Sequence, residues 1–360
     1  MAGEKRTGRV EVPTIKTLAE ITGYSIATVS KALRGSEVVT EETREIIFQA
    51  ARRIGYTANQ RGQALRTGKT YQIAVLMPST AASGYEWDGV EYTQILSGVA
   101  QALDGTGYRI SAHLITDAED GAAMARQIAG LGLADGLIFS GILADDPRIS
   151  LLAASDFPFV TLGRCRTDHV YAHVDVDNEW AAHAATARLI AGGHRRIALV
   201  NPSRSLSYAL DRIDGFSRAF REAGQAAPLE LVVDGDLSTR FGRESAWQLL
   251  DAEEPPTAFI CVNESTALGV MSGLAGRGLQ VGRDVDVIAY DDINVSAYFN
   301  PPVTTLYQPI EAVARTLGQF LLRRIAGEPA ADLNQVFRPS LVARQPDNAS
   351  MPETPITGGE

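Results

Sequence analysis

From Tyr71 onward the sequence alternates short apolar runs with amphipathic helical stretches, and this alternation constrains the fold more than any other feature. Such alternation is typical of parallel strands joined by crossover helices. The runs predicted as strands are YQIAVLMP, YRISAHLIT, ADGLIFSG, FPFVTLG, RRIALVNP, LELVVDG, TAFICVN and VDVIAYD. Helices predicted between them include residues 91–103, 179–190, 208–222, 240–250 and 265–277. We therefore predict an α/β fold of parallel sheets. Because so many units, spread over about 275 residues, exceed one comfortable sheet, two similar lobes are favoured.

Residues 14–33, TIKTLAEITGYSIATVSKAL, indicate two short helices joined by a tight turn. Thr14 and Ser25 are suitable N-caps for them. The inward face of the second helix carries Val29, Ala32 and Leu33, and its outer face carries Ala27, Ser30, Lys31 and Arg34. A small, polar and basic outer face fits a major groove, as in a helix-turn-helix DNA reader. On spacing alone, two amphipathic helices of an unrelated domain are an equal alternative.

A third helix is predicted to begin after Thr40, which caps it, with Glu41 and Glu42 in the first turn where the helix dipole favours acids. Its apolar face comprises Ile46, Ile47, Ala50 and Ile54, and Gly55 ends it. Three helices in this stretch predict a small DNA-binding headpiece over residues 1–58.

Residues 59–70 follow the headpiece as a short polar segment. Asn59 is a suitable cap for a helix over residues 60–66, but so short and polar a helix is unstable in water by itself. Arg61, Arg66 and Lys69 surround Leu65, so we interpret the segment as a hinge helix that folds on DNA, with Leu65 as a minor-groove wedge. A disordered linker is the alternative.

The charge distribution separates the first 70 residues from the remainder. The net charge is −10, but residues 1–70 hold 12 Lys and Arg against 7 Asp and Glu, or +5, and the remainder holds 21 against 36, or −15. A basic head on an acidic body is expected when only the head meets nucleic acid. The sequence shows no signal peptide and no run approaching the roughly 18 apolar residues of a membrane span. We expect a cytoplasmic protein.

Neither a metal nor another cofactor is predicted. Cys165 and Cys261 lack CxxC spacing, so we expect two reduced, packed cysteines. His169 and His173 would lie roughly 13 Å apart in an extended strand, which is too far to share a metal ion.

Polar side chains follow the predicted strands at their carboxyl ends, the edge where open α/β sheets bind ligands. They include Ser79, Ser140, Arg164, Asn201, Asp236, Asn263, Glu264, Asp291 and Asp292. An arginine, carboxamides and carboxylates converging on one crevice suit a neutral ligand rich in hydroxyl groups. Each residue could equally be a helix cap, and Asn263 and Asp236 are good ones.

Over residues 14–345 the chain resembles the lactose repressor/galactose repressor (LacI/GalR) family of bacterial transcription factors. The resemblance rests on residues 14–33, VTEETRE, IGYTANQRGQALRTGKT, DVDN, GGHRRIALVNP, DRIDGF, NESTALGVM, VDVIAYDD, PPVTTLYQP and RPSLVARQ. The order and separations of these strings are highly specific. The family implies a homodimer that binds a near-palindromic double-stranded operator. It also implies a periplasmic-binding-protein-like core whose small-molecule effector changes DNA affinity.

The residue pattern and the resemblance together assign residues to DNA binding. They are Thr14, Ser25, Ile26, Ala27, Thr28, Ser30, Lys31 and Arg34 in the headpiece, and Asn59, Arg61, Leu65 and Arg66 in the hinge helix. Ile26 and Ala27 stand where family members place base-reading residues. Because their side chains form no hydrogen bonds, direct readout would depend on contact with a thymine methyl and on Lys31.

The resemblance also implies effector-binding residues. They are Arg212, Asn263 and Asp291 as recurrent contacts, Tyr92 and Tyr208 from the two lobes, and Arg164 and Gln308 as additional candidates. The strings DDPR and FPFVTLGR resemble members that answer to glucosides or other disaccharides, so the implied effector is a sugar. No catalytic residues are assigned.

The predicted core spans residues 71–345, with an N-lobe of about 71–174 and 303–335 and a C-lobe of about 175–302 and 336–345. Residues 346–360, PDNASMPETPITGGE, are predicted to be a disordered tail without a heptad helix, which favours a dimer over a tetramer. The alternative function is a sugar- or nucleotide-processing enzyme that uses Glu264, Asp291 and Asp292 as acid and base. The chain offers no nucleophile elbow, HExxH motif or glycine-rich phosphate loop after a strand.

Overall fold

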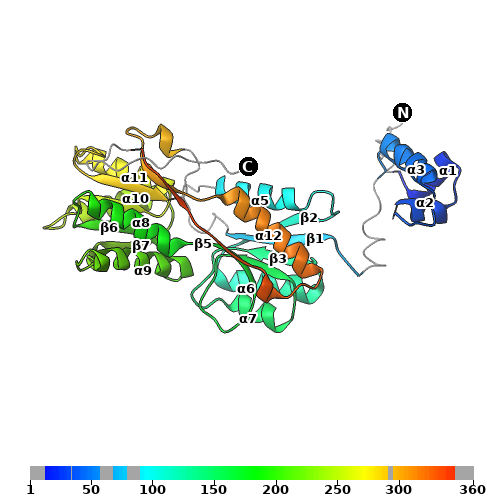
Figure 1. The fold of residues 1–360 in the computed structure, drawn as a ribbon, viewed down its shortest axis with the longest axis horizontal. Coiled ribbons are helices and arrows are strands. Elements are labelled where there is room, and N and C mark those ends of the chain that lie inside the picture. Colours follow the sequence, from blue (N-terminus) through cyan, green and yellow to red (C-terminus); the bar gives the residue numbers. More distant parts are fainter. Residues whose placement is uncertain (1–12, 34, 57–67, 79–89, 291–294, 345–360) are drawn as a thin grey trace, which may run out of the picture. The chain divides into compact units, whose positions relative to one another are not determined.

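The computed structural model describes residues 13–33, 35–56, 68–78, 90–290 and 295–344 (Figure 1). The chain divides into two compact units, Met1–Tyr71 and Gln72–Glu360. Several predicted site residues lie outside the described residues, namely Arg34, Asn59, Arg61, Leu65, Arg66, Ser79, Asp291 and Asp292. The predicted hinge helix and the predicted disordered tail also lie outside them.

The first unit contains the three predicted headpiece helices, α1 (Ile15–Thr22), α2 (Ile26–Leu33) and α3 (Glu41–Ile54). Thr14 and Thr40 cap α1 and α3 as predicted, each accepting a hydrogen bond from the backbone three residues later. The helices pack around the fully buried Leu18, Val29 and Ile47.

One of the residues predicted for the headpiece core is not buried. Ile46 is 43% exposed, and Ala51 is buried in its place. Ile47, Ala50, Ala51 and Ile54 follow the i, i+3, i+4, i+7 spacing of one helix face, and Ile46 falls beside that stripe.

The second unit begins with a lobe built on a six-stranded sheet of order β11-β5-β4-β3-β1-β2, in which every pair is parallel. Its strands are β1 (Gln72–Pro78), β2 (Arg109–Ile115), β3 (Gly136–Phe139), β4 (Phe159–Leu162), β5 (Ala172–Val176) and β11 (Asn334–Phe337). Its helices are α5 (Val90–Ala102), α6 (Ala118–Leu131), α7 (Pro147–Ala154) and α12 (Ile310–Ile325), with the 3-10 turn η4 (Ala330–Asp332).

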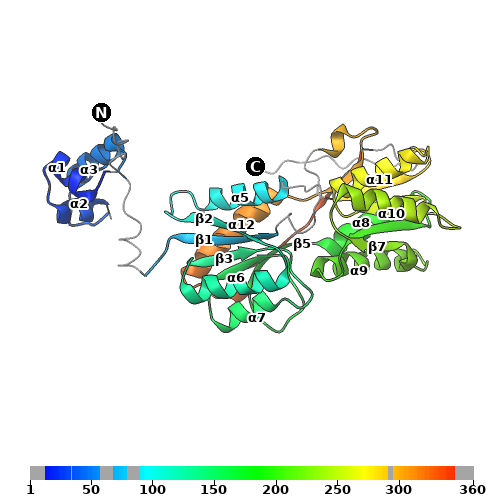
Figure 2. The same cartoon turned by 180° about the vertical axis from the view of Figure 1, so that it is seen from behind.

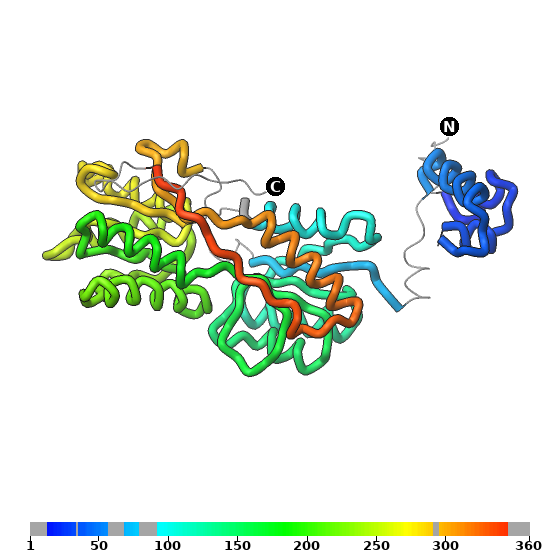
Figure 3. The backbone as a smooth tube through the Cα atoms, in the orientation of Figure 1, coloured from blue at the N-terminus to red at the C-terminus, as the bar shows by residue number. Residues whose placement is uncertain are grey.

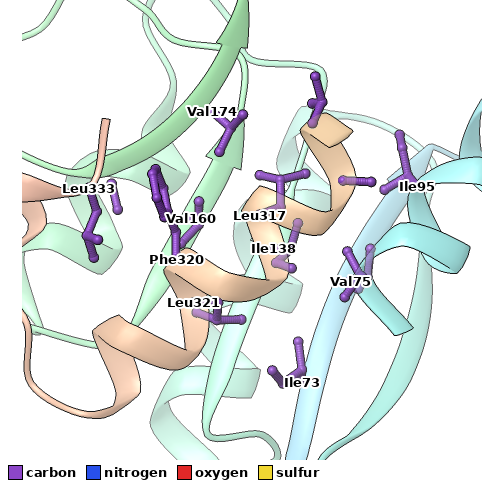
Figure 4. Packing of buried hydrophobic residues seen from close by; sticks show 14 of the residues in the cluster. Ile73, Val75, Ile95, Ile138, Val160, Val174, Leu317, Phe320, Leu321 and Leu333 are labelled. Carbon is purple, nitrogen blue, oxygen red and sulfur yellow. The ribbon is translucent and has the colours of Figure 1, made fainter. Parts of the chain in front are cut away.

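Helices cover both faces of this first sheet. Leu317 and Leu321 of α12 pack with Ile138, Val160 and their neighbours on one face, where α5 also lies (Figure 4). The other face is covered by α6 and α7 (Figure 2). Burial on both faces explains why the strands read as continuous apolar runs.

The second lobe repeats this plan, with strand order β12-β10-β9-β8-β6-β7 and only the β10–β12 pair antiparallel among the described strands. Its strands are β6 (Ile197–Pro202), β7 (Val232–Gly235), β8 (Ala258–Cys261), β9 (Asp286–Tyr290), β10 (Thr304–Tyr307) and β12 (Ser340–Val342). Its helices are α8 (Asn178–Ala191), α9 (Ser207–Glu222), α10 (Thr239–Leu250) and α11 (Glu264–Gly276), with the turns η2 (Leu229–Leu231) and η3 (Ser296–Tyr298). The pair α8 and α9 covers one face, and α10 and α11 cover the other.

The chain passes between the lobes after β5, after β10 and after β11, as the tube in Figure 3 shows. The predicted lobe boundaries differ from these positions. Residues 304–307 were expected in the first lobe but form β10 of the second sheet, where residues 304–306 pair with β9. The strands β5 and β11 extend past the predicted boundaries at 174 and 335 within the first sheet.

The eight predicted strands and the five predicted helices occur in the structure, with helix ends within one residue of prediction. The strands β10, β11 and β12 were not predicted from the sequence, and β5 was predicted only as part of an extended run. Three of the four residues of β11 are exposed, so this edge strand carries no apolar run.

None of the described helices is long and apolar enough to cross a membrane. Cys165 and Cys261 are both free thiols, as predicted. Burial raises the pKa of each thiol.

Candidate DNA-binding helix and effector site

The surface of α2 presents the residues predicted to read DNA. Ile26 is 46% exposed, and Ala27 and Lys31 are also exposed, whereas Thr28 and Ser30 are half-buried. The helix is held from its opposite side by the fully buried Val29 and Ala32. It therefore presents an apolar patch beside a cation.

Two of the predicted DNA-binding residues have structural roles at helix starts. The Thr17 amide donates to Thr14 Oγ1 at 3.3 Å, and the Thr28 amide donates to Ser25 Oγ at 3.1 Å. Both hydroxyl residues are exposed, so each also faces solvent at the positive end of a helix dipole. Helix starts of this kind are suited to phosphate groups.

The candidate effector site lies at the carboxyl ends of the strands of the second unit. Arg212 in α9 is its central side chain and is only 5% exposed. Its Nε donates to Asn178 Oδ1 at 3.0 Å, and Nη1 donates to the Val262 carbonyl at 3.0 Å. The guanidinium lies 3.8 Å from the ring centroid of Tyr290 and 5.2 Å from that of Tyr208.

These contacts fix the guanidinium at the starts of α8 and α9 and at the ends of β8 and β9. Within the part of the chain that the structure describes, Arg212 Nη2 makes no hydrogen bond. A fixed arginine with one remaining donor nitrogen is suited to orient a ligand hydroxyl or carbonyl oxygen.

Asn263 fills the helix-cap role that the sequence predicted as an alternative to ligand binding. Its Oδ1 accepts from the Thr266 amide at 2.8 Å and caps α11, and its Nδ2 donates to the Leu237 carbonyl at 3.1 Å. Asn201 is fully buried, and its Nδ2 donates to the Ala209 carbonyl at 3.1 Å. Asp236 accepts from the Ser238 amide at 2.8 Å. The capping and turn roles are therefore filled at these strand ends.

Arg164 is paired with a buried carboxylate. Its Nε lies 3.1 Å from Asp175 Oδ2, and Asp175 is largely buried in β5. Burial raises the pKa of Asp175 from 3.8 to about 6, while a hydrogen bond from the Val176 amide and the charge of Arg164 act to lower it. Burial likewise raises the pKa of Asp211, on which Arg164 also acts. This pair in the first lobe thus interacts electrostatically with α9 of the second.

Other arginines near these strand ends have carboxylate partners as well. The closest atom pairs are Arg148 with Asp146 at 2.6 Å, Arg204 with Asp234 at 2.6 Å and Arg166 with Asp214 at 3.0 Å. Pre-paired cations offer little excess positive charge to an anionic ligand.

The remaining candidates lie at separate places. The hydroxyl groups of Tyr92 and Ser140 are 3.2 Å apart in the first lobe. Gln308 is half-buried where the chain leaves the second lobe. Asn178 and Tyr290 were not predicted as site residues. The DVDN and VDVIAYDD strings contain them, but only the fold brings them to Arg212.

Across the described ranges no group of three or more His, Cys, Asp or Glu residues is arranged to hold a metal ion. Glu264, a proposed acid/base residue in the alternative function, is 2% exposed and accepts from the Ser296 amide at 2.7 Å.

Two family models match the chain. Residues 14–59 match the bacterial regulatory proteins of the lacI family, and residues 186–345 match a periplasmic binding protein-like domain. The HTH-type transcriptional regulator AglR of Rhizobium meliloti (strain 1021) is 33% identical over 358 residues, which cover 96% of this chain and 99% of AglR.

Solved structures show the same likeness. A complex of the transcriptional regulator CelR with cellobiose aligns with a TM-score of 0.70 and 28% identity, covering 92% of this chain and 99% of that one. A Lac repressor dimer bound to operator and the anti-inducer ONPF aligns with a TM-score of 0.79 and 26% identity, covering 93% and 99%.

Proposed function

Because the chain belongs to the lacI family of bacterial regulatory proteins and is therefore a DNA-binding transcriptional regulator, we propose that it is a repressor controlled by a sugar. A homodimer binds a near-palindromic operator through two headpieces. A small sugar held between the two lobes changes the operator affinity. The protein acts in the cytoplasm, where its operator lies.

Operator reading is assigned to the exposed surface of α2. Ile26 and Ala27 pack on thymine methyl groups, and Lys31 contacts a base edge or a phosphate. Thr14 and Ser25 lie at the starts of α1 and α2, which face the DNA backbone. Thr28 and Ser30 complete the contact surface. This assignment is supported by the exposure of Ile26, Ala27 and Lys31 on a helix whose other side buries Val29 and Ala32.

The effector is a neutral sugar, possessing paired hydroxyl groups and no charge. The observation that carries this proposal is the fixed guanidinium of Arg212, stacked on Tyr290 and held by neutral partners. A sugar oxygen completes its hydrogen bonding, with Asn263, Tyr208 and Tyr92 as further contacts and with Arg164 and Gln308 as additional candidates. Asp291, which lies outside the described residues, is retained as a contact implied by the family resemblance. The carboxylate partners of the surrounding arginines disfavour phosphorylated or acidic sugars. Cellobiose in the related CelR complex makes disaccharides the first candidates.

Homodimer formation is supported by exposed apolar side chains on the second lobe. Tyr298 is 86% exposed, and Val295 and Leu268 are also exposed. Exposed large apolar side chains are found at protein interaction sites. The related Lac repressor was solved as a dimer.

Effector and operator are linked through one equilibrium. Whichever arrangement of the lobes the sugar binds better becomes more populated, and operator affinity follows that population. No specific observation favours the enzymatic alternative, since Glu264 is enclosed and already accepts a backbone hydrogen bond.

A gel-shift titration tests the proposal. The full-length protein is mixed with double-stranded DNA from upstream of its own gene, with and without cellobiose, maltose, trehalose or sucrose. We expect a shifted complex whose midpoint moves at least tenfold with one neutral sugar and not with glucose 6-phosphate. The absence of any shift at low salt contradicts operator binding, and a shift that no sugar moves contradicts the effector assignment.

A further inference from the structure

Besides the chain crossings, the two lobes are joined by direct backbone contacts. The Ala144 amide donates to the Ser205 carbonyl at 3.0 Å, and the Ser207 amide donates to the Ile142 carbonyl at 2.8 Å. Between these hydrogen bonds, Leu143 and Leu206 form an antiparallel bridge. We call residues 142–144 and 205–207 together the clasp.

The position of the clasp in the two sheets makes it sensitive to rotation of one lobe against the other. It follows β3 in the first lobe and β6 in the second. In the first sheet β4 separates β3 from the crossing strand β5, and in the second β8 and β9 separate β6 from the crossing strand β10. Because the clasp is offset from the crossing strands by one strand in the first sheet and by two in the second, a rotation of one lobe about the crossings displaces its two halves. Hydrogen bonds weaken steeply when distance and angle change, so such a rotation opens the clasp.

A buried ion pair holds the first half of the clasp in shape. Arg148 is 4% exposed, and its Nε and Nη2 donate to the two carboxylate oxygens of Asp146 at 2.9 and 2.6 Å. The same arginine donates to the Gly141 carbonyl at 2.9 Å and lies over the Phe139 ring. Asp146 Oδ2 also accepts from the Leu143 amide at 3.0 Å. The pair thereby connects the end of β3 directly to the bridge residue.

Nearby contacts between the lobes are weaker. Arg166 and Asp214 pair across the lobes at 3.0 Å, but both side chains are mostly exposed. Exposed ion pairs contribute little to stability. The clasp, with backbone hydrogen bonds supported by a buried pair, is therefore the stronger of these two connections.

We propose that the clasp is the connection through which effector binding changes operator affinity, with Asp146 and Arg148 as positioning residues that hold it in register. This inference rests on the proposed function. The lobe arrangement with the clasp made and the arrangement with it broken are the two states that the effector and the operator bind unequally.

Disulfide trapping tests whether the clasp forms in solution. In the bridge, hydrogen bonds flank Leu143 and Leu206, so they form a non-hydrogen-bonded antiparallel pair with Cα atoms about 4.5 Å apart. That separation suits a disulfide. The variant Leu143→Cys/Leu206→Cys is made in a Cys165→Ala background and oxidised mildly, while Cys261 stays because it is fully buried. Leu143→Cys/Leu210→Cys is the out-of-register control.

We expect peptide mapping to find the crosslink in most chains of the first variant and in few chains of the control. A folded, correctly dimeric protein without the crosslink overturns the proposal. This readout needs neither operator nor sugar, so it separates failure of the clasp from failure of the proposed function.

A charge pair at the same two positions tests whether the clasp controls DNA binding. Leu143→Asp/Leu206→Asp places like charges opposite each other and opens the clasp, whereas Leu143→Asp/Leu206→Lys places opposite charges there and retains it. We expect the first variant to change operator affinity at least tenfold without any sugar and the second to match the original protein within threefold. Equal affinities of the two variants overturn the proposal.

The role of Asp146 is tested in the trapping variant. Adding Asp146→Asn removes the charge of the carboxylate but keeps its shape, so the crosslinking rate should fall at least fivefold while circular dichroism and the dimeric state persist. Adding Asp234→Asn, which removes the partner of the exposed Arg204, is the matched control and should leave the rate unchanged. Equal crosslinking rates in the two backgrounds contradict a positioning role.

Discussion

At the scale of single residues, Arg212 determines what the effector site can recognise. Its planar guanidinium is stacked on Tyr290 and hydrogen-bonded at two nitrogens, which fixes the direction of the remaining one. Lysine retains the charge but lacks this fork and this stacking, so the exchange is not conservative.

We therefore expect Arg212→Lys to weaken sugar binding at least tenfold, or about 1.4 kcal/mol, as measured by calorimetry with the sugar that moves the gel shift. Arg283→Lys provides the control, because Arg283 is exposed and pairs with its neighbour Asp284. Unchanged affinity in Arg212→Lys would exclude the guanidinium from recognition.

Asp175 should make the stability of the folded protein depend on pH. Burial raises its pKa in the folded protein from 3.8 to about 6. The folded state thus binds more protons than the unfolded state between these values, and the contribution of Asp175 to stability falls as pH rises. Relative to Asp175→Asn, the original protein should lose on the order of 1 kcal/mol between pH 5 and pH 7.5. Urea unfolding of both proteins at the two pH values measures this difference. A constant difference would mean that Asp175 titrates normally.

At the scale of elements, the α10–α11 contact depends on glycines. A Cβ at Gly269 would lie 1.9 Å from the Thr239 carbonyl oxygen, whereas a Cβ at Gly276 in the same helix meets only Trp247 Nε1 at 3.7 Å. Gly269→Ala must separate two backbones and should cost about 3 kcal/mol. Gly276→Ala should be neutral or stabilise by about 0.5 kcal/mol. Thermal unfolding of the two variants distinguishes them, and equal melting temperatures would contradict the described packing.

The charge on the contact helix α2 should affect how operator binding depends on salt concentration. Lys31 is its exposed cation among the described residues of the helix. Lys31→Ala should weaken operator binding and reduce the slope of log Kd against log salt by about 1 for each headpiece that loses a phosphate contact. Arg283→Ala, altered in the core unit, should leave the slope unchanged. Fluorescence anisotropy over a range of salt concentrations measures both variants. An unchanged slope with weaker binding would assign Lys31 to base reading alone.

Local signals explain which elements the sequence could predict. The caps Thr14 and Thr40 and the buried runs of the central strands act within a few residues of chain, and they were predicted correctly. The strand β11 has mostly exposed side chains, so no apolar period reveals it. The crossing after Tyr307 depends on pairing with β9, which no local pattern encodes.

The same distinction applies to the candidate site. Arg212 was identified because of the motif around it, but its partners Asn178, Val262 and Tyr290 come from three other elements. Arg164 was predicted as a ligand contact, whereas its pairing with Asp175 follows only from the neighbouring strands β4 and β5. Motifs therefore indicate which residues matter, and the fold supplies the contacts that orient them.

At the scale of the whole molecule, function requires that the sugar site and the operator site share one equilibrium. Reciprocity follows, because the factor by which sugar changes operator affinity must equal the factor by which operator changes sugar affinity. A coupling of tenfold corresponds to about 1.4 kcal/mol, which a small number of hydrogen bonds between the lobes can supply.

The most direct test is the operator Kd of the full-length dimer, measured by fluorescence anisotropy with and without a saturating concentration of the sugar that binds most tightly in calorimetry. We predict a change of at least tenfold, and a matching change in sugar affinity when operator DNA is bound. Equal operator Kd values with and without that sugar would contradict the claim that the core controls the headpiece.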